Sequence, residues 1–472
     1  MPQSAKAHAP VQSLLWDELF GKPVAVEFSA ERLTDNAGLL LPAAVDRRWG
    51  LTARIAAGLR DRRAPELIVH TILDLVRQRV YGLLAGFADA NDAARLKNDP
   101  TFRLLLSRSL EDEEDALASQ PTFSRFENAI GVGSLMRWAQ TLTAAVLERQ
   151  RARRKRVRRI TLDLDPTDDA THGQQCFSFF NTHYASWCFL PLLAFATFHD
   201  ERNREEAERY LLVALLRRGN ADATLGFAGV VRRLVQRCRE VFPEARLRVR
   251  LDGAYATPEI FVLLEEELRV EYVVNMGKND VLKRLAEPLL QRARLAATLS
   301  GHSERVFGEV PYSAGTWNGV TRRAVLKAEV TIDPRAPDKG MKDNPRIVIT
   351  NLKSEPQHVY CEEYCPRGAM EKGINELKND LFMDRTSCSD FNANQLRVLL
   401  AATAYILIQE LRTQAQGTAA ERWEVDHLRT RLFKVAAIVV ESTRRWLLKL
   451  SQFAPDRELW TTLALRVLAA PT

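Results

Sequence analysis

Four chemically distinctive side chains share one side of a predicted helix in the segment Tyr364–Lys378, which reads YCPRGAMEKGINELK. At about 100° per residue, with Arg367 as zero, Lys378 lies at about 20°, Glu371 at about 40° and Tyr364 at about 60°. Glu371 is the only acid in that arc, so it is placed to share a cation or a phosphate with its basic neighbours. The alternative is an exposed helix with ordinary ion pairs, such as Arg367 with Glu371. Because Pro366 suits the first turn of a helix, we expect Tyr364 just before that helix.

Two aspartates close hydrophobic strands elsewhere in the chain. RRITLDLDPT alternates apolar and polar residues and carries Asp165 at its end, and RLRVRLDGAY carries Asp252. Either Asp alone is more often a turn or cap residue. An unpaired charge at the end of a buried strand, however, is costly without a function. Together with Glu371 the two aspartates offer the hard oxygen ligands that Mg²⁺ prefers, and two such ions about 4 Å apart support cleavage of a phosphodiester.

Residue spacing alone leaves the first carboxylate open. Asp163 shares the strand face of Asp165, and Asp168 and Asp169 follow closely. All four positions are therefore compatible with the pattern.

The order Tyr364, two residues, Arg367, three residues, Glu371, six residues, Lys378 resembles the Y-R-E-K motif of the DDE transposases of bacterial insertion sequences. The surrounding RGAMEKGINELKNDL is most similar to the insertion-sequence 1380 family, and LTDNAGLLL, ANDAARLKNDP and QPTFSRFEN resemble its N-terminal region. The D-x-T form of Asp165 to Thr167 matches the first motif of that family and favours Asp165 over Asp163.

This resemblance, from about Val24 to about Leu468, implies an α/β fold with a ribonuclease H-like catalytic core. It implies that Asp165, Asp252 and Glu371 bind two Mg²⁺ ions, with Mn²⁺ as a substitute. Tyr364, Arg367 and Lys378 would contact the DNA backbone near the cut.

The function implied is that of a transposase that cleaves the inverted-repeat ends of its element and joins the 3′-hydroxyls to target DNA. Its partners would be double-stranded DNA and a second copy of the chain, in the bacterial cytoplasm at the nucleoid. Two alternatives are a ribonuclease H-like, structure-specific nuclease and a catalytically silent DNA-binding protein derived from a transposase.

Strands alternating with helices after residue 159 favour an α/β sheet with parallel pairing. The 118 residues between Asp252 and Glu371 exceed what a strand and a helix need, which indicates an insertion. The predicted parts are a mainly helical DNA-binding region at 1–148, a basic tract at 149–159, a catalytic core at 160–278 and 345–393, a β-rich insertion at 279–344 and a helical C-terminal region at 394–472. Within them we expect helices through NREEAERYLLVALLRR and HLRTRLFKVAAIVVESTRRWLLKL. The latter is either a surface helix or one that contacts a partner or DNA.

The basic tract Arg149–Arg159 reads RQRARRKRVRR, in which eight of eleven residues are basic and none is acidic. Such charges repel one another unless a polyanion is near, so the tract, with Arg153, Arg154, Lys155 and Arg156 at its centre, predicts contact with nucleic acid. The alternative is a solvated linker.

Other polar positions are less informative. Trp317 in the insertion is a candidate for stacking on a base, and its alternative is a core position. Some Y-R-E-K enzymes hold a flipped base on a Trp in the strand matching RIVITNL, where this chain has Arg346, so the resemblance does not extend to a hairpin intermediate. His172, just beyond the first aspartates, is either a DNA contact or a loop residue.

Composition excludes several classes of protein. With 46% hydrophobic and 27% charged residues, the chain is typical of a globular protein rather than a disordered one. No apolar run reaches the roughly 18 residues of a membrane span, and the N-terminus lacks the apolar core of a signal peptide. Six scattered Cys indicate a reducing compartment, and the Cys361–Cys365 pair lacks the partners of a zinc site.

Overall fold

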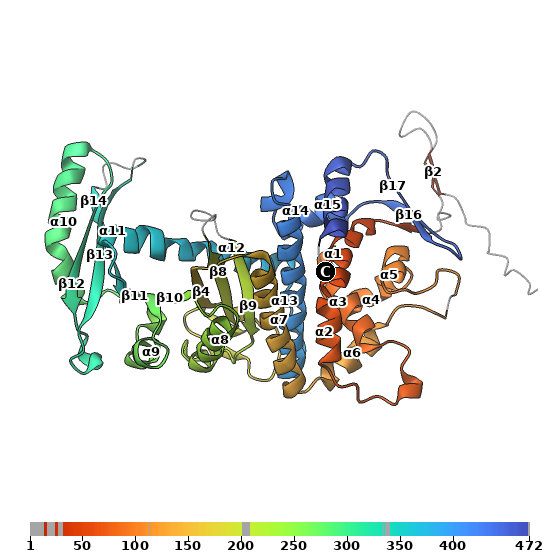
Figure 1. Ribbon diagram of the computed structural model, residues 1–472, viewed down its shortest axis with the longest axis horizontal. Helices are drawn as coiled ribbons and strands as arrows, with labels where there is room; N and C mark the ends of the chain where they lie inside the picture. The colour runs from red at the N-terminus through yellow and green to blue at the C-terminus, as the bar shows by residue number, and fades with distance from the viewer. Residues whose placement is uncertain are drawn as a thin grey trace, which may run out of the picture.

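The computed structural model describes residues 32–470 except 113, 201–207, 334 and 336–339, together with the backbone of two short antiparallel strands, β1 Leu14–Trp16 and β2 Val24–Val26. The molecule is elongated, with a mixed sheet in its middle, a helical region at one end and a helix-backed part of the same sheet at the other (Figure 1). No helix in the described ranges is long and apolar enough to cross a membrane.

The central sheet has nine strands in the described part of the chain, in the order β12-β13-β15-β11-β10-β4-β8-β9, with β14 paired to β13. Its strands are β4 Arg159–Pro166, β8 Leu192–His199, β9 Arg209–Leu215, β10 Arg246–Leu251, β11 Glu271–Met276, β12 Glu304–Tyr312, β13 Arg322–Ile332, β14 Met341–Asp343 and β15 Arg346–Thr350. β10 is parallel to both β4 and β11, and the other pairs are antiparallel. The carboxyl ends of β4 and β10 therefore lie at the same edge of the sheet.

The N-terminal region is mainly helical, as predicted. Its α-helices are α1 Leu40–Trp49, α2 Leu51–Ala57, α3 Ile72–Ala85, α4 Ala93–Leu96, α5 Pro100–Leu105, α6 Gln120–Ala129 and α7 Val132–Arg153. α3 begins with a capping box, in which Thr71 and Asp74 each accept a bond from the other's backbone N–H. Short 3₁₀ turns precede α1, α3 and α4: η1 Ala37–Leu39, η2 Pro65–Leu67 and η3 Ala90–Asp92.

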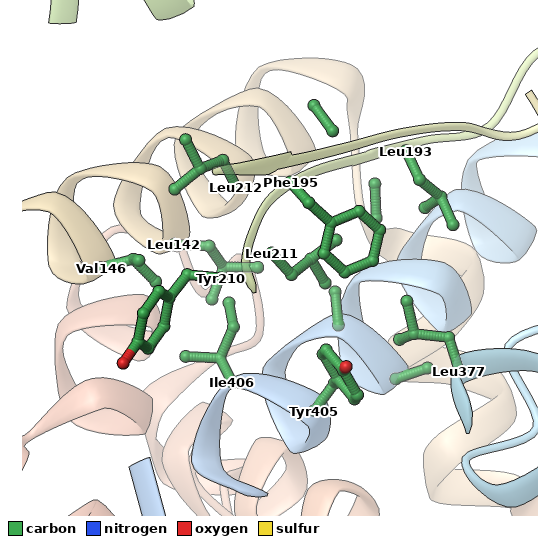
Figure 2. Packing of buried hydrophobic residues seen from close by; sticks show 14 of the residues in the cluster. Leu142, Val146, Leu193, Phe195, Tyr210, Leu211, Leu212, Leu377, Tyr405 and Ile406 are labelled. Carbon is green, nitrogen blue, oxygen red and sulfur yellow. The ribbon is translucent and has the colours of Figure 1, made fainter. Parts of the chain in front are cut away.

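Two long helices, α7 and α13 Phe391–Gln414, pack against the edge strand β9. Figure 2 shows Tyr210 and Leu211 of β9 beside Leu142, Val146 and Ile406 from these helices. The free edge of β9 is covered by side chains of α13, since Leu211 N donates to Gln409 Oε1 at 3.1 Å and Leu216 N donates to Gln395 Oε1 at 2.7 Å. These glutamines bond backbone N–H groups that could otherwise pair with a strand of another chain.

Further helices and short turns follow α7 along the chain. They are α8 Phe227–Val241, α9 Pro258–Val262, α10 Asp280–Ser300, α14 Val425–Leu428 and α15 Arg457–Ala469, with short turns η4 Gly253–Tyr255, η5 Leu263–Glu267, η6 Gly315–Trp317, η11 Ala419–Arg422 and η12 Arg429–Phe433. Thr257 caps α9 by accepting a bond from Ile260 N.

The segment predicted as an insertion contributes to the same sheet as the core. β13 pairs directly with β15, so the strands after α10 extend the central sheet. α10 covers them through small and apolar residues, Ala286, Leu290, Ala293 and Ala297, which pack on Ala328 and Val330.

Two helix predictions were wrong. The described part of NREEAERYLLVALLRR is strand β9, because its residues pair with β8 and pack on α7 and α13; residues 201–207 lie outside the described ranges. The C-terminal segment HLRTRLFKVAAIVVESTRRWLLKL is helical only as far as Phe433. It then forms a hairpin of β16 Ala437–Glu441 and β17 Trp446–Leu450, and β16 also pairs with β3 Leu33–Thr34. The run of β-branched residues Ile438 to Val440 favours the strand.

Candidate functional site

The four residues of the predicted helix face lie on one continuous helical segment from Pro356 to Asp380. It consists of α11 Pro356–His358, a π-helical turn η8 Val359–Tyr364, a 3₁₀ turn η9 Cys365–Ala369, α12 Met370–Asn375 and a second π-helical turn η10 Glu376–Asp380. Tyr364 therefore lies within the helical segment and not before it, because the change of helical type accommodates Pro366.

Three carboxylates approach one edge of the sheet. Asp165 lies near the end of β4, and Asp252 follows β10, where its Oδ1 accepts a bond from Ala254 N at 3.0 Å. Glu371 is exposed on the first turn of α12. The position of α12 depends on Gly373, where an added Cβ would lie 2.9 Å from Tyr405 Oη and 3.0 Å from Phe195 Cε1.

The electrostatic environment links the three acids. Burial raises the pKa of Asp165 to about 6, the Arg367 guanidinium opposes that shift, and the negative charges of Asp252 and Glu371 add to it. Arg367 Nη2 lies 2.6 Å from Asp165 Oδ1, so a cation already occupies one side of this carboxylate. In the described residues no three His, Cys, Asp or Glu side chains are grouped closely enough to hold a metal ion.

The acids near Asp165 have partners of their own. Asp163 is fully buried, and both its oxygens accept bonds from Arg250, at 2.6 and 2.5 Å. Lys378 Nζ donates to Asp168 Oδ1 at 2.8 Å. Asp169 is buried and accepts from Thr386 Oγ1.

Beside Lys378 lies a surface pocket of about 450 Å³, lined by polar residues that include His172, Gln175 and Arg385. Tyr364 is half-buried 5.8 Å from the ring of Tyr360, and burial raises its pKa. The structure thus brings Lys378 and His172 to one pocket and Arg367 to the carboxylates.

A small sheet with exposed aromatic side chains lies next to the candidate site and was not predicted from the sequence. Strands β5 Asp169–Ala170, β6 Phe179–Asn181 and β7 Ser186–Phe189 form a small sheet, in which Phe180 and Trp187 face each other and are 50% and 59% exposed. Burial and the charges of Asp168, Asp165 and Asp252 raise the pKa of Tyr184, in the β6–β7 turn, to about 12. The available signal was composition, because Ala170 to His199 contains many aromatics and no Asp, Glu, Lys or Arg.

The basic tract contains no acidic residue, but acidic residues from other parts of the chain pair with several of its arginines. Glu410 pairs with Arg149 and Arg153, and Asp200 pairs with Arg154 at 2.6 Å. Lys155 and Arg156, like Arg151, are exposed and have no ion pair in the part of the chain that the structure describes. Arg153 and Arg154 thus hold the end of α7 to distant acids.

Trp317 is a core residue and not a surface for a base. It is 2% exposed, its ring lies 5.1 Å from Phe261 and 5.3 Å from Tyr312, and Arg322 lies over it at 4.9 Å. No ring face is left for a ligand. Cys361 and Cys365 are free thiols.

The pKa of Asp169 gives a prediction about stability. Burial raises the pKa of the Asp169 carboxyl to about 7, so the folded protein binds the carboxyl proton more tightly than the unfolded chain does. The resulting stabilisation of the fold is present below about pH 4 and is lost as the pH rises through about 7. The Asn side chain of Asp169→Asn cannot ionise. The free energy of unfolding of this variant, relative to that of the wild type, should therefore rise by about 2 kcal/mol between about pH 5 and pH 8. Urea unfolding at both pH values measures this gain, and a constant difference would contradict the assignment. Asp112→Asn, at an exposed acid, serves as the control.

Comparison with known proteins identifies the family. The family described as transposase DDE domain group 1 matches residues 17–472. A search of curated proteins found no match. Because the matched residues cover nearly the whole chain, the protein belongs to the DDE transposase domain family, group 1.

Proposed function

We propose that this transposase binds the terminal inverted repeats of its element, hydrolyses the DNA at the ends and joins the 3′-hydroxyls to target DNA. The observation that carries the proposal is the electrostatic coupling of Asp165 with Asp252 and Glu371 at one edge of the sheet, beside Arg367. Like charges brought together in this way favour binding of a cation.

A ribonuclease H-like core is part of the proposal. Three antiparallel strands, β9, β8 and β4, are followed in the sheet by β10 and β11, which run parallel to β4. This arrangement, with one acid at the end of β4, one after β10 and the third on a later helix, supports that core. The spacing of Tyr364, Arg367, Glu371 and Lys378 supports membership of the insertion-sequence 1380 group with its Y-R-E-K motif.

The chemistry of the donor set fits Mg²⁺, and the three side chains would have to come closer together than in this structure to bind it. Asp165, Asp252 and Glu371 offer only hard carboxylate oxygens, and Arg367 already shows that a cation is favoured against Asp165. When bound, two Mg²⁺ ions, or Mn²⁺ in their place, would supply charge neutralisation at phosphorus and an activated oxygen nucleophile.

The protein side chains have separate tasks in this proposal. Asp165 would act as a ligand in its ionised form, which is also the form that pairs with Arg367. With a cation bound at Asp165, Arg367 would be available to the DNA phosphate, where its planar guanidinium can pair with two oxygens. Lys378 and Tyr364 hold the neighbouring backbone.

The exposed residues of the basic tract are proposed to contact DNA. Replacing Arg151, Lys155 and Arg156 together with Ala should weaken binding and flatten the dependence of log K on log salt by about 0.9 for each phosphate that is no longer neutralised. A salt titration by fluorescence anisotropy measures this slope. The control is Ala at Arg232, Arg233 and Arg237, exposed basic residues on α8, of which Arg232 and Arg237 are in ion pairs. An unchanged slope, or the same change in the control, would mean that the tract is a linker.

We further propose that two copies act together on DNA. One set of carboxylates acts on one end at a time, whereas coordinated insertion needs two 3′-hydroxyls, and a two-fold dimer provides two sites.

The direct test incubates the protein with Mg²⁺, DNA carrying the inverted repeats that flank its own coding frame, and a target plasmid. The proposal expects 3′-hydroxyl ends and joined products. Cleavage without joining would favour the nuclease alternative, and binding without cleavage the catalytically silent one.

A further inference from the structure

We infer that Asp163 and Arg250 are positioning residues that set the three candidate carboxylates relative to one another. The inference rests on the proposed function of Asp165, Asp252 and Glu371. It concerns two buried residues that do not themselves reach a ligand.

The pair lies directly beneath the candidate site. In the parallel pairing of β4 and β10, Arg250 is the partner of Asp163. Because alternate residues of a strand share a face, Asp165 and Asp252 lie on the same faces two residues further along. Arg250 Nε and Nη2 donate to the two oxygens of Asp163 at 2.6 and 2.5 Å. This two-point bond fixes the register of β4 against β10, and with it the relative positions of Asp165 and Asp252.

The same arginine also holds the helical segment of Glu371. Pro366 has no N–H, so a carbonyl in the preceding turn lacks its helical donor. Arg250 Nη1 donates to Glu363 O at 2.9 Å, and Arg209 Nη2 donates to Pro366 O at 2.6 Å. The break in the helical segment is therefore tied to strands β10 and β9.

Side-chain ion pairs strengthen this tie. Glu363 is buried and pairs with Arg248 and, at 3.1 Å, with Arg159. Buried ion pairs are seldom more stabilising than apolar contacts of the same size, because both partners lose hydration. Their directional bonds, however, restrict where the segment can lie. The network thus suits positioning better than it suits stability.

Asp163→Asn tests the inference, because the amide keeps the shape of the side chain and removes the charge that holds Arg250. Mn²⁺ binding to the protein with end DNA is measured by electron paramagnetic resonance, independently of cleavage. We expect the midpoint to rise by about 10- to 100-fold, the usual effect of losing a group that orients metal ligands. DNA affinity should stay within about twofold of the wild type, since the buried Asp163 has no part in binding phosphates.

The matched control is Asp46→Asn, which also removes a fully buried carboxylate, bonded there to Thr52 and Tyr81 in the N-terminal helices. It should lower the unfolding temperature without moving the Mn²⁺ midpoint. Arg250→Lys keeps the charge but not the two-point bond, so its Mn²⁺ midpoint should lie between those of the wild type and Asp163→Asn. This variant provides the test if Asp163→Asn fails to fold.

The outcomes separate the inference from the proposed function. An unchanged midpoint in Asp163→Asn, or an equal shift in Asp46→Asn, would overturn the inference alone. A wild-type protein that binds no Mn²⁺ even with DNA would overturn the proposed function, and the inference with it.

Discussion

Replacing Glu371 with Gln is expected to abolish DNA cleavage while leaving DNA binding nearly intact. The amide cannot neutralise a metal ion, and losing several kcal/mol of transition-state stabilisation corresponds to a fall of about a thousandfold or more. Glu371 is exposed on α12, so the fold should not depend on its charge. Single-turnover cleavage of end DNA and an anisotropy titration measure the two effects.

The control for this change is Glu362→Gln, the same substitution at an exposed acid on the same helical segment. It should cleave at the wild-type rate. If Glu371→Gln retained more than about a tenth of the activity, Glu371 would not be a metal ligand.

Arg367→Gln is expected to separate metal binding from cleavage. In the present structure Arg367 neutralises Asp165 at 2.6 Å, so its removal leaves Asp165 available to a cation and should strengthen Mn²⁺ binding in the absence of DNA. Cleavage should nevertheless fall by about 100-fold, because the phosphate loses a fixed cationic donor. Titration with Mn²⁺ and single-turnover rates with saturating metal measure the two changes.

Arg367→Lys provides the comparison, since it keeps the charge but not the planar fork. We expect it to recover part of the rate. Weaker Mn²⁺ binding in Arg367→Gln would show instead that Arg367 supports the metal site directly.

The strands that carry the candidate site could be predicted because their patterns are local. Alternation in RRITLDLDPT and RLRVRLDGAY is enough to identify strands that end near Asp165 and Asp252. The helical character of the segment that carries Arg367 and Lys378 was predicted from residue spacing, but the spacing could not reveal the π-helical and 3₁₀ turns around Pro366. Arg367 pairs with Asp165 and Lys378 with Asp168, so the common face stays a prediction.

What could not be predicted depends on partners far away in the chain. Glu410 pairs with Arg153 from more than 250 residues away, so the charge of the tract could not be judged from its own residues. Strand β9 was mistaken for a helix because its apolar residues suit either periodicity, and pairing with β8 decides between them. Trp317 and Tyr184 illustrate the same limit, since only the tertiary fold determines that one is in the core and the other is near the acids.

The central claim is that Asp165, Asp252 and Glu371 together hold the catalytic metal at a DNA end. The most direct measurement is a crystal structure of the protein with end DNA and Mn²⁺, with the metal located by its anomalous signal. The account predicts a peak bound by all three carboxylates at about 2.0–2.2 Å, with the scissile phosphate beside it. A metal bound elsewhere, or a DNA-bound structure in which any of the three side chains lies out of reach of the others, would contradict it.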